Sequence, residues 1–377
     1  MVQKQFDRCC GCGACASVCP KDAIEIVADD RGFYKPKVLE SCIQCGACLQ
    51  VCPVEQPPRG EAPRSFYACA AEPERVRSSS SGGVFSLLAE AVLSQGGVVF
   101  GCGWGEGHLP QPLMVDTLDA LKMLYGSKYA QSQMEGIFPK VRQQLKLGKK
   151  VLFSGTPCQV AGLRRFLKKE YENLIAIDFI CHGVPSAKVL EKHLKELEQK
   201  QKARIQSLTF RDKSKGWKEL QLTVAFEDGS FYSQPASQDP YYRAFLCNLS
   251  LNKICGDCPF NTLPRSADIT LGDFWRVERH HQDFAENAGV SCVTVSTEKG
   301  EALFESIMSK LTAVPSSQAD IMDGNPFLDG HCQLHKRRDR FFRELDQKPL
   351  DVLAEDCLKL TKWEWFREVL AYKLGRK

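Results

Sequence analysis

The sequence predicts a chain of mixed α+β and α/β class, with a small N-terminal module followed by a larger mixed α/β domain. A run of cysteines repeats after 33 residues within the first 53 positions. A stretch rich in proline and charge, PVEQPPRGEAPR, follows this repeat, and beyond it strand-like and helix-like segments alternate. We therefore expect a module at residues 1–56, a linker at 57–65, a large domain at 66–345 and a helical tail at 346–377.

The repeated cysteine run has the spacing C-x2-C-x2-C-x3-C-P, first at Cys9–Pro20 and again at Cys42–Pro53. This spacing is that of bacterial ferredoxins, in which the fourth cysteine of each run binds the other cluster. It predicts a ferredoxin-like module with two 4Fe–4S clusters, whereas zinc favours separated C-x2-C pairs. Cys10 falls outside the spacing, and we expect it to bind no iron. The first cluster set is Cys9, Cys12, Cys15 and Cys52, and the second cluster set is Cys42, Cys45, Cys48 and Cys19.

Composition narrows the class of protein. Of 377 residues, 43% are hydrophobic and 25% are charged, and the net charge is only +4. Such a charge gives no reason to expect a nucleic-acid partner. No apolar run reaches the roughly 18 residues of a membrane span, and the N-terminus lacks a signal-peptide core, so we expect a cytoplasmic protein. In a reducing compartment, many of the 19 cysteines are expected to bind metal rather than form disulfides.

A strand–helix–strand unit places two further cysteines. Lys150–Ser154 reads as a buried strand, Thr156 as the N-cap of a helix that ends near Lys169, and Leu174–Ile180 as a second strand. So short a connection implies parallel neighbouring strands, whose carboxyl ends share one edge of the sheet. Cys158 and Cys181 follow those ends, so we expect them to converge there.

The motif Cys255-Gly256-Asp257-Cys258 supplies two more thiols. A lone C-x-x-C is typical of zinc, redox or cluster sites alike. Together with the two cysteines at the sheet edge it completes a set of four, for which Cys247 is a competing member. We expect this third cluster set, Cys158, Cys181, Cys255 and Cys258, to hold a third 4Fe–4S cluster.

Several other segments have readable patterns. The run SSSSGGVF opens a helix near Val84–Ser94, and its free N–H groups suit a phosphate, although an ordinary helix start has the same pattern. A strand is expected at 98–101; no helix follows the Gly101–Gly105 run, which excludes a dinucleotide fingerprint there. Residues 205–233 predict antiparallel strands with a turn at Glu227–Gly229, and strands are also expected at 267–271 and 290–296.

The motifs SSGGVFS, GSKYAQS, FSGTPCQVAGL, DFICHGVPS and ADITLGDFW resemble the beta subunits of coenzyme F420 hydrogenases and dehydrogenases, a group that includes 7-hydroxymethyl chlorophyll a reductase. The resemblance covers about residues 66–345. It implies a bound FAD beside a 4Fe–4S cluster held by the third cluster set. It further implies flavin contacts at Ser81, Gly82, Gly83, Lys128, Tyr129, Ser132, Thr156 and Gln159.

Together these patterns predict an iron–sulfur flavoprotein oxidoreductase with three 4Fe–4S clusters and FAD. Electrons would pass between the clusters and a two-electron carrier or small-molecule substrate. The alternatives are an electron-input subunit of a separate catalytic protein and a zinc-stabilised interaction module. Expected partners are a ferredoxin-like protein or a reduced nicotinamide or deazaflavin carrier, and a homo-oligomer or a larger complex stays open. Candidate catalytic or anion-binding residues are His182, Arg211 and Lys213, each with an equally ordinary structural explanation.

Overall fold

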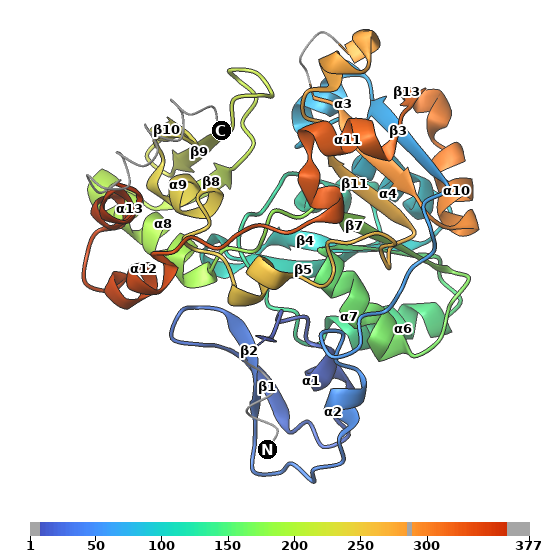
Figure 1. Ribbon diagram of the computed structural model, residues 1–377, viewed down its shortest axis with the longest axis horizontal. Helices are drawn as coiled ribbons and strands as arrows, with labels where there is room; N and C mark the ends of the chain where they lie inside the picture. Colours follow the sequence, from blue (N-terminus) through green and yellow to red (C-terminus); the bar gives the residue numbers. More distant parts are fainter. Residues whose placement is uncertain (1–7, 285–288, 360–377) are drawn as a thin grey trace, which may run out of the picture.

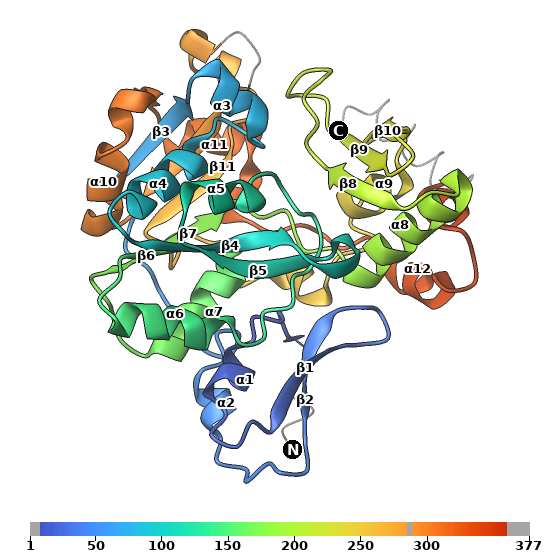
Figure 2. The same cartoon turned by 180° about the vertical axis from the view of Figure 1, so that it is seen from behind.

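The computed structural model describes residues 8–284 and 289–359. They form a small N-terminal module, a large sheet with helices on its two faces, and a lobe built on a second, three-stranded sheet (Figure 1). The module lies beneath α6 and α7 in Figure 1 and again in the view from behind (Figure 2). The predicted fold class is therefore confirmed.

The N-terminal module consists of two short helices and one hairpin. Each helix begins directly after a glycine with positive φ, Gly13 at 77° and Gly46 at 74°, a backbone conformation that other residues rarely adopt. These tight turns place Cys15 and Cys48 in the first turn of their helices. The elements are α1 (Ala14–Val18), β1 (Ile24–Ala28), β2 (Tyr34–Val38) and α2 (Ala47–Gln50), with β1 and β2 antiparallel.

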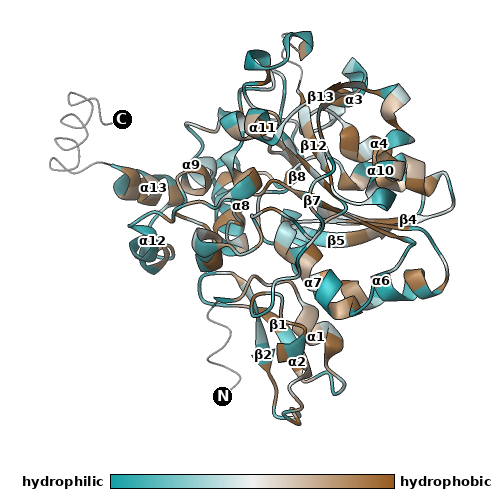
Figure 3. Ribbon diagram, turned by 45° about the vertical axis from the view of Figure 1, so that its right-hand side comes forward, coloured by the Kyte–Doolittle hydropathy of each residue, from teal (hydrophilic) through white to brown (hydrophobic). Residues whose placement is uncertain are grey.

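The large sheet has eight strands in the order β13-β3-β12-β11-β7-β6-β4-β5. Four consecutive strands, β11, β7, β6 and β4, are parallel, whereas the strands on either side of them pair antiparallel. In Figure 3 the strand β4 is coloured as hydrophobic, as expected where both faces of a sheet are covered. The strands are β3 (Ser65–Ala70), β4 (Val98–Trp104), β5 (Pro110–Val115), β6 (Val151–Gly155), β7 (Leu174–Phe179), β11 (Ile269–Asp273), β12 (Ser291–Val295) and β13 (Thr312–Pro315).

The predicted strand–helix–strand unit is present. β6 and β7 are parallel neighbours, with Val151 opposite Leu174, and α7 connects them. α7 begins where the sequence predicted, because Pro157 fits the first helical position and the N–H of Thr156 donates to Gln159 Oε1 at 2.9 Å. Its apolar face, which includes Val160, Leu163 and Phe166, packs on the sheet.

Helices cover the two faces of the large sheet. One cluster of buried residues joins α4 and α10 to the sheet, and another joins α6 and α7 to it. The second cluster also contains Cys12, Ala14 and Val51, so the module shares a core with α6 and α7. The helices of the large domain outside the second lobe are α3 (Pro73–Ser78), α4 (Val84–Leu93), α5 (Leu118–Leu121), α6 (Ile137–Lys146), α7 (Pro157–Leu167), α10 (Glu298–Glu305) and α11 (Gln318–Gly324).

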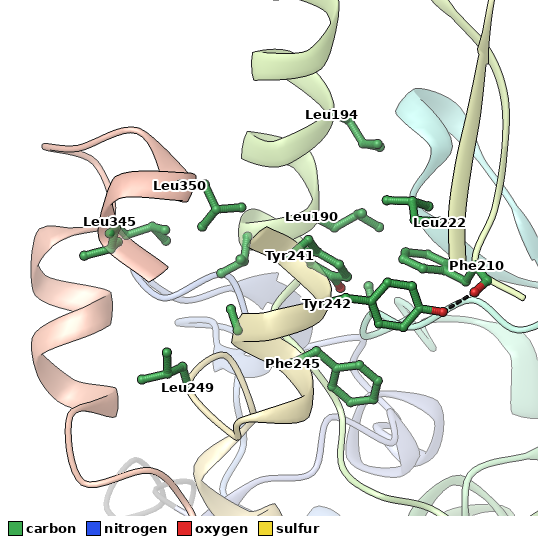
Figure 4. Packing of buried hydrophobic residues seen from close by; sticks show 14 of the residues in the cluster. Leu190, Leu194, Phe210, Leu222, Tyr241, Tyr242, Phe245, Leu249, Leu345 and Leu350 are labelled. Atoms are coloured by element: carbon green, nitrogen blue, oxygen red, sulfur yellow. Dashed lines mark hydrogen bonds between the residues drawn. The ribbon is translucent and has the colours of Figure 1, made fainter. Parts of the chain in front are cut away.

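The second lobe is built around aromatic side chains. Tyr241 and Tyr242 are fully buried, and the Tyr242 hydroxyl donates to the Phe210 carbonyl (Figure 4). The Tyr241 hydroxyl donates to the Tyr129 carbonyl. The predicted hairpin is confirmed: β9 and β10 are antiparallel, and the N–H of Gly229 donates to Phe226 O at 3.0 Å. The elements are α8 (Ala187–Gln201), β8 (Ile205–Thr209), β9 (Gln221–Phe226), β10 (Phe231–Pro235), α9 (Pro240–Leu246), α12 (Arg338–Glu344) and α13 (Leu350–Leu358).

The predicted domain boundaries stay predictions, but the structure shows how the segments near them pack. Gly60 of the predicted linker lies against the backbone of Arg265. α13, which falls within the predicted tail, packs Leu350 and Leu353 into the same cluster as α9, while residues 360–377 lie outside the described residues. Within residues 8–284 and 289–359, no helix has the length and apolar composition that crossing a membrane requires.

Asp268, just before β11, ties three elements together and is fully buried. Its carboxylate accepts hydrogen bonds from the Ala176 N–H at 2.6 Å, from Thr297 Oγ1 at 2.9 Å and from an Arg164 guanidinium nitrogen at 3.0 Å. Removing one partner of such a buried ion pair leaves the other charge and its donors without compensation.

We therefore predict that Asp268→Ala lowers the free energy of unfolding by about 3–5 kcal/mol. The exposed Asp116→Ala is the control, and it should change that free energy by less than about 0.5 kcal/mol. Urea unfolding of both anaerobically prepared variants measures the difference. Equal midpoints for the two variants would contradict this role of Asp268.

Candidate iron–sulfur and flavin sites

The second cluster set lies at the far end of the module. Cys19, Cys42, Cys45 and Cys48 line one pocket, together with Ile43 and Gly46. The structure thus brings the fourth cysteine of the first run to the three close-spaced cysteines of the second run. The N–H of Ala23 donates to Cys19 Sγ at 3.2 Å, a bond of the kind that stabilises a cluster-bound thiolate. Cys45 and Ile43 are exposed, so this set reaches the surface.

The first cluster set lies deeper, towards the large domain. Burial, and then the neighbouring Cys12, raise the pKa of Cys9 to about 12, and Cys52 contributes in the same direction. Burial and the same neighbours also raise the pKa of Cys15. Cys9 and Cys15 therefore lie near Cys12 and Cys52, and a bound cation would stabilise the buried thiolates of Cys9 and Cys15. The N–H of Gly11 donates to Cys9 Sγ at 3.3 Å.

The third cluster set gathers at the carboxyl edge of the parallel strands. Burial, then Cys158 and Cys258, raise the pKa of Cys181, and burial, then Cys181, raise that of Cys255. The four thiols therefore face one another from three elements: the start of α7, the end of β7, and the loop that follows α9. The N–H of Val184 donates to Cys255 Sγ at 3.4 Å. Cys158 differs, because contact with Cys10, then Thr156 and the helix N–H groups, lower its pKa.

Two other cysteines are compared with this set: Cys247, which the sequence suggested as an alternative ligand, and Cys332, which it did not single out. Cys247, the competing candidate, lies at the end of α9, where partial burial raises its pKa and the nearby Arg243 opposes that shift. Cys332, which the sequence did not single out, is buried in the loop before α12, and its thiol donates to Cys255 O at 3.5 Å. Its long separation from the C-x-x-C motif left no spacing signal by which to find it.

Within the described residues, no three His, Cys, Asp or Glu side chains converge closely enough to hold a single metal ion. A tetrahedral zinc site needs every sulfur about 2.3 Å from one atom, whereas a cubane binds each thiolate to a different iron. The four thiols of a cubane site therefore need not meet at one point.

The predicted flavin residues fall into two groups. Ser81, Gly82 and Gly83 lead into α4, where Ser81 Oγ donates to Val290 O at 2.8 Å and the Gly82 N–H donates to Ser291 Oγ at 2.9 Å. In the serine loop, residues 79–81, Ser80 accepts from Ser127 Oγ at 2.9 Å, so the chain just before Lys128 lies beside this loop. The ring of Tyr129 packs against Phe210 and Phe245 of the second lobe. Lys128 Nζ donates to the carbonyl of Tyr125 at 2.6 Å, and burial lowers the pKa of Lys128 to about 8.

The second group surrounds the start of α7. Gln159 Nε2 donates to Ser132 Oγ at 2.9 Å, and Gln159 Oε1 accepts from the Thr156 N–H. Thr156 Oγ1 lies 3.1 Å from Cys158 Sγ. Three predicted flavin residues therefore form one hydrogen-bonded group beside a member of the third cluster set.

The three candidate catalytic residues have structural partners. His182 lies between the rings of Phe245 and Phe327, its Nε2 is 2.7 Å from Asn248 Oδ1, and burial lowers its pKa. Arg211 forms a bidentate pair with Asp273, at 2.7 and 3.2 Å.

Lys213, the third candidate, reaches the serine loop. Its Nζ donates to Ser81 O at 2.9 Å, and burial, then Arg211, lower its pKa to about 8. Lys213 and Arg211, whose Nη1 donates to Tyr129 Oη at 3.2 Å, are therefore the two candidates that contact predicted flavin residues.

Two family models match parts of this chain. Residues 148–318 match the family described as the C terminus of the beta subunit of coenzyme F420 hydrogenase/dehydrogenase. This segment belongs to that family. Residues 8–56 match the 4Fe–4S dicluster domain. The chain is therefore of the iron–sulfur oxidoreductase type, with a cluster-binding module in front of the beta-subunit segment.

One solved structure is also similar, a chain in the xenon-derivatised F420-reducing [NiFe] hydrogenase complex from Methanosarcina barkeri. It shares 15% identity, the match covers 72% of this chain and 92% of that chain, and the TM-score is 0.48. So distant a likeness supports no inference about this chain. No curated protein matches it significantly.

We predict that Cys158→Ser loses about four irons per chain while the clusters of the N-terminal module remain. The reason is that a cubane bound by four thiolates loses one of them. Iron and sulfide analysis of reconstituted protein measures the loss, and Cys247→Ser, which removes an exposed thiol outside all three sets, should lose none. Full iron content in Cys158→Ser would show that Cys158 is not a ligand.

Proposed function

We propose that this chain is a flavin- and iron–sulfur-dependent oxidoreductase with three 4Fe–4S clusters and one FAD. One observation supports the proposal above the others: Thr156 and Gln159, predicted to contact the flavin, share a hydrogen-bonded group with Cys158 of the third cluster set. Flavin and cluster would then meet at the start of α7. When bound, FAD exchanges single electrons with clusters and electron pairs with a carrier or substrate.

The residues near the serine loop suit the anionic part of FAD. Lys213 Nζ reaches this loop through Ser81 O, whereas Lys128 follows Ser127, whose hydroxyl donates to Ser80, and its own Nζ donates to the Tyr125 carbonyl. The start of α4 offers further N–H groups, since the first turn of a helix leaves several without partners. These donors would bind a diphosphate and orient the cofactor, while the group at Ser132, Thr156 and Gln159 would fix its other end.

Two roles share this arrangement. In the first, the chain reduces or oxidises its own small-molecule substrate, and we favour it because the chain holds both cluster ligands and flavin-binding groups. In the second, it feeds electrons to a separate catalytic protein. Anaerobic purification with cofactor analysis should yield FAD at about one per chain. Reoxidation of that flavin by nicotinamide, deazaflavin or other small carriers supports the first role, whereas reoxidation only by a protein partner supports the second.

Lys128 gives a prediction about pH. A protonated ammonium attracts a diphosphate, so FAD affinity should fall as the pH rises through about 8, where Lys128 and Lys213 lose their protons. Lys128→Met should raise the Kd for FAD by about tenfold at pH 7, because it removes one charge-assisted contact. It should also weaken the pH dependence, leaving the contribution of Lys213.

Fluorescence titration of the apoprotein with FAD measures both effects. The control is Lys140→Met, which changes an exposed lysine on α6. An unchanged Kd and pH profile in Lys128→Met would place the cofactor elsewhere. A protein that retains iron but takes up no FAD would refute the flavin part of the proposal.

A further inference from the structure

Cys10 is outside both cysteine spacings, yet the structure places it between two of the cluster sets. Its thiol interacts with Cys12 of the first cluster set and with Cys158 of the third cluster set. Each of those sets already contains four cysteines. Cys10 is therefore positioned to contact ligand sulfurs of two clusters without being needed as a ligand of either.

The backbone around Cys10 is held by the large domain from two sides. Gln131 Nε2 donates to Cys10 O at 3.3 Å, and Gln131 Oε1 accepts from the Tyr34 N–H at 2.8 Å. On the other side, Asn252 Nδ2 donates to Cys9 O at 3.3 Å. Asn252 caps the short helical turn that carries Cys255, so one side chain connects the first and third cluster sets.

The packing of α1 on α7 brings the same two sets together. Cys158 and Gly162 are four residues apart and so lie on one face of α7. A Cβ on Gly162 would come within 2.8 Å of Cys12 Sγ, so Cys12 sits directly on this face. The pocket of the second cluster set is lined by residues of the module alone, with none from the large domain, and Cys45 is exposed.

We propose that Cys10 is a positioning residue at a fixed junction between the first and third clusters, and that the second cluster is where electrons from a partner enter. The proposal rests on the three clusters of the proposed function. The Cys10 thiol donates a hydrogen bond to a ligand sulfur at this junction. Each transfer across it moves one electron from the reduced site to the oxidised site, and no bond or proton at Cys10 changes.

The consequence is measurable in reduction potentials. Hydrogen bonds to cluster sulfurs stabilise the more negative, reduced cluster and so raise its potential. Cys10→Ala should therefore lower the potential of the first or third cluster and leave that of the second unchanged. Cys10→Ser keeps a donor of similar size, so its potentials should stay close to those of the unsubstituted protein. Both variants should keep their full iron content.

Redox titration of the full chain, followed by electron paramagnetic resonance, tests this. Cys158→Ser identifies the signal of the third cluster, and Cys247→Ala is the control for loss of a thiol. Stopped-flow reduction should also show that electrons reach the third cluster several-fold more slowly in Cys10→Ala than in Cys10→Ser.

Unchanged potentials of the first and third clusters in Cys10→Ala, or a shift of the second cluster alone, would overturn the junction. Loss of about four irons in Cys10→Ala would overturn it too, since Cys10 would then be a ligand. A failure of the proposed function is distinct, because the unsubstituted protein would then lack the spectrum of three clusters.

Discussion

Cys12 rests on Gly162 of α7, at a position where any side chain would collide with its sulfur. The other contacts between module and domain depend on this close approach, since α1 shares a hydrophobic core with α6 and α7. α7 in turn is fixed by β6 and β7, and by the buried pair of Arg164 with Asp268. The module is thus packed against the sheet through α7, which is the element that also presents Cys158.

In the proposed function, the start of α7 would serve two kinds of ligand. Its N–H groups and Thr156 lower the pKa of Cys158, while Gln159 connects Thr156 to Ser132. A helix N-terminus favours negative charge, whether on a thiolate or on a cofactor. Burial raises the pKa of the remaining thiols of the third cluster set, so loading of a cluster there would be coupled to completion of this part of the fold.

Much of the prediction came from patterns among residues close together in the sequence. Spacing predicted the first and second cluster sets, and the sheet edge together with the C-x-x-C motif predicted the third. The β6–α7–β7 unit followed from a capping box between two buried strands. The pairing of strands that are distant in the sequence could not be predicted from local pattern. Nothing in the sequence near Ser65–Ala70 indicates that β3 lies between β12 and β13. For the same reason the sequence predicted an anion site at Arg211 but missed its partner Asp273, and it treated Cys10 as inert. The place of β3, the partner of Arg211 and the environment of Cys10 each depend on residues that are distant in the sequence.

The central claim is that three clusters are held in a fixed order, with the first between the second and the third. Iron-edge anomalous diffraction from anaerobically grown crystals tests it most directly. The account predicts three iron peaks, at the three cysteine sets, with the third peak closer to the first than to the second. Two peaks only, or a third peak closer to the second cluster set, would contradict it.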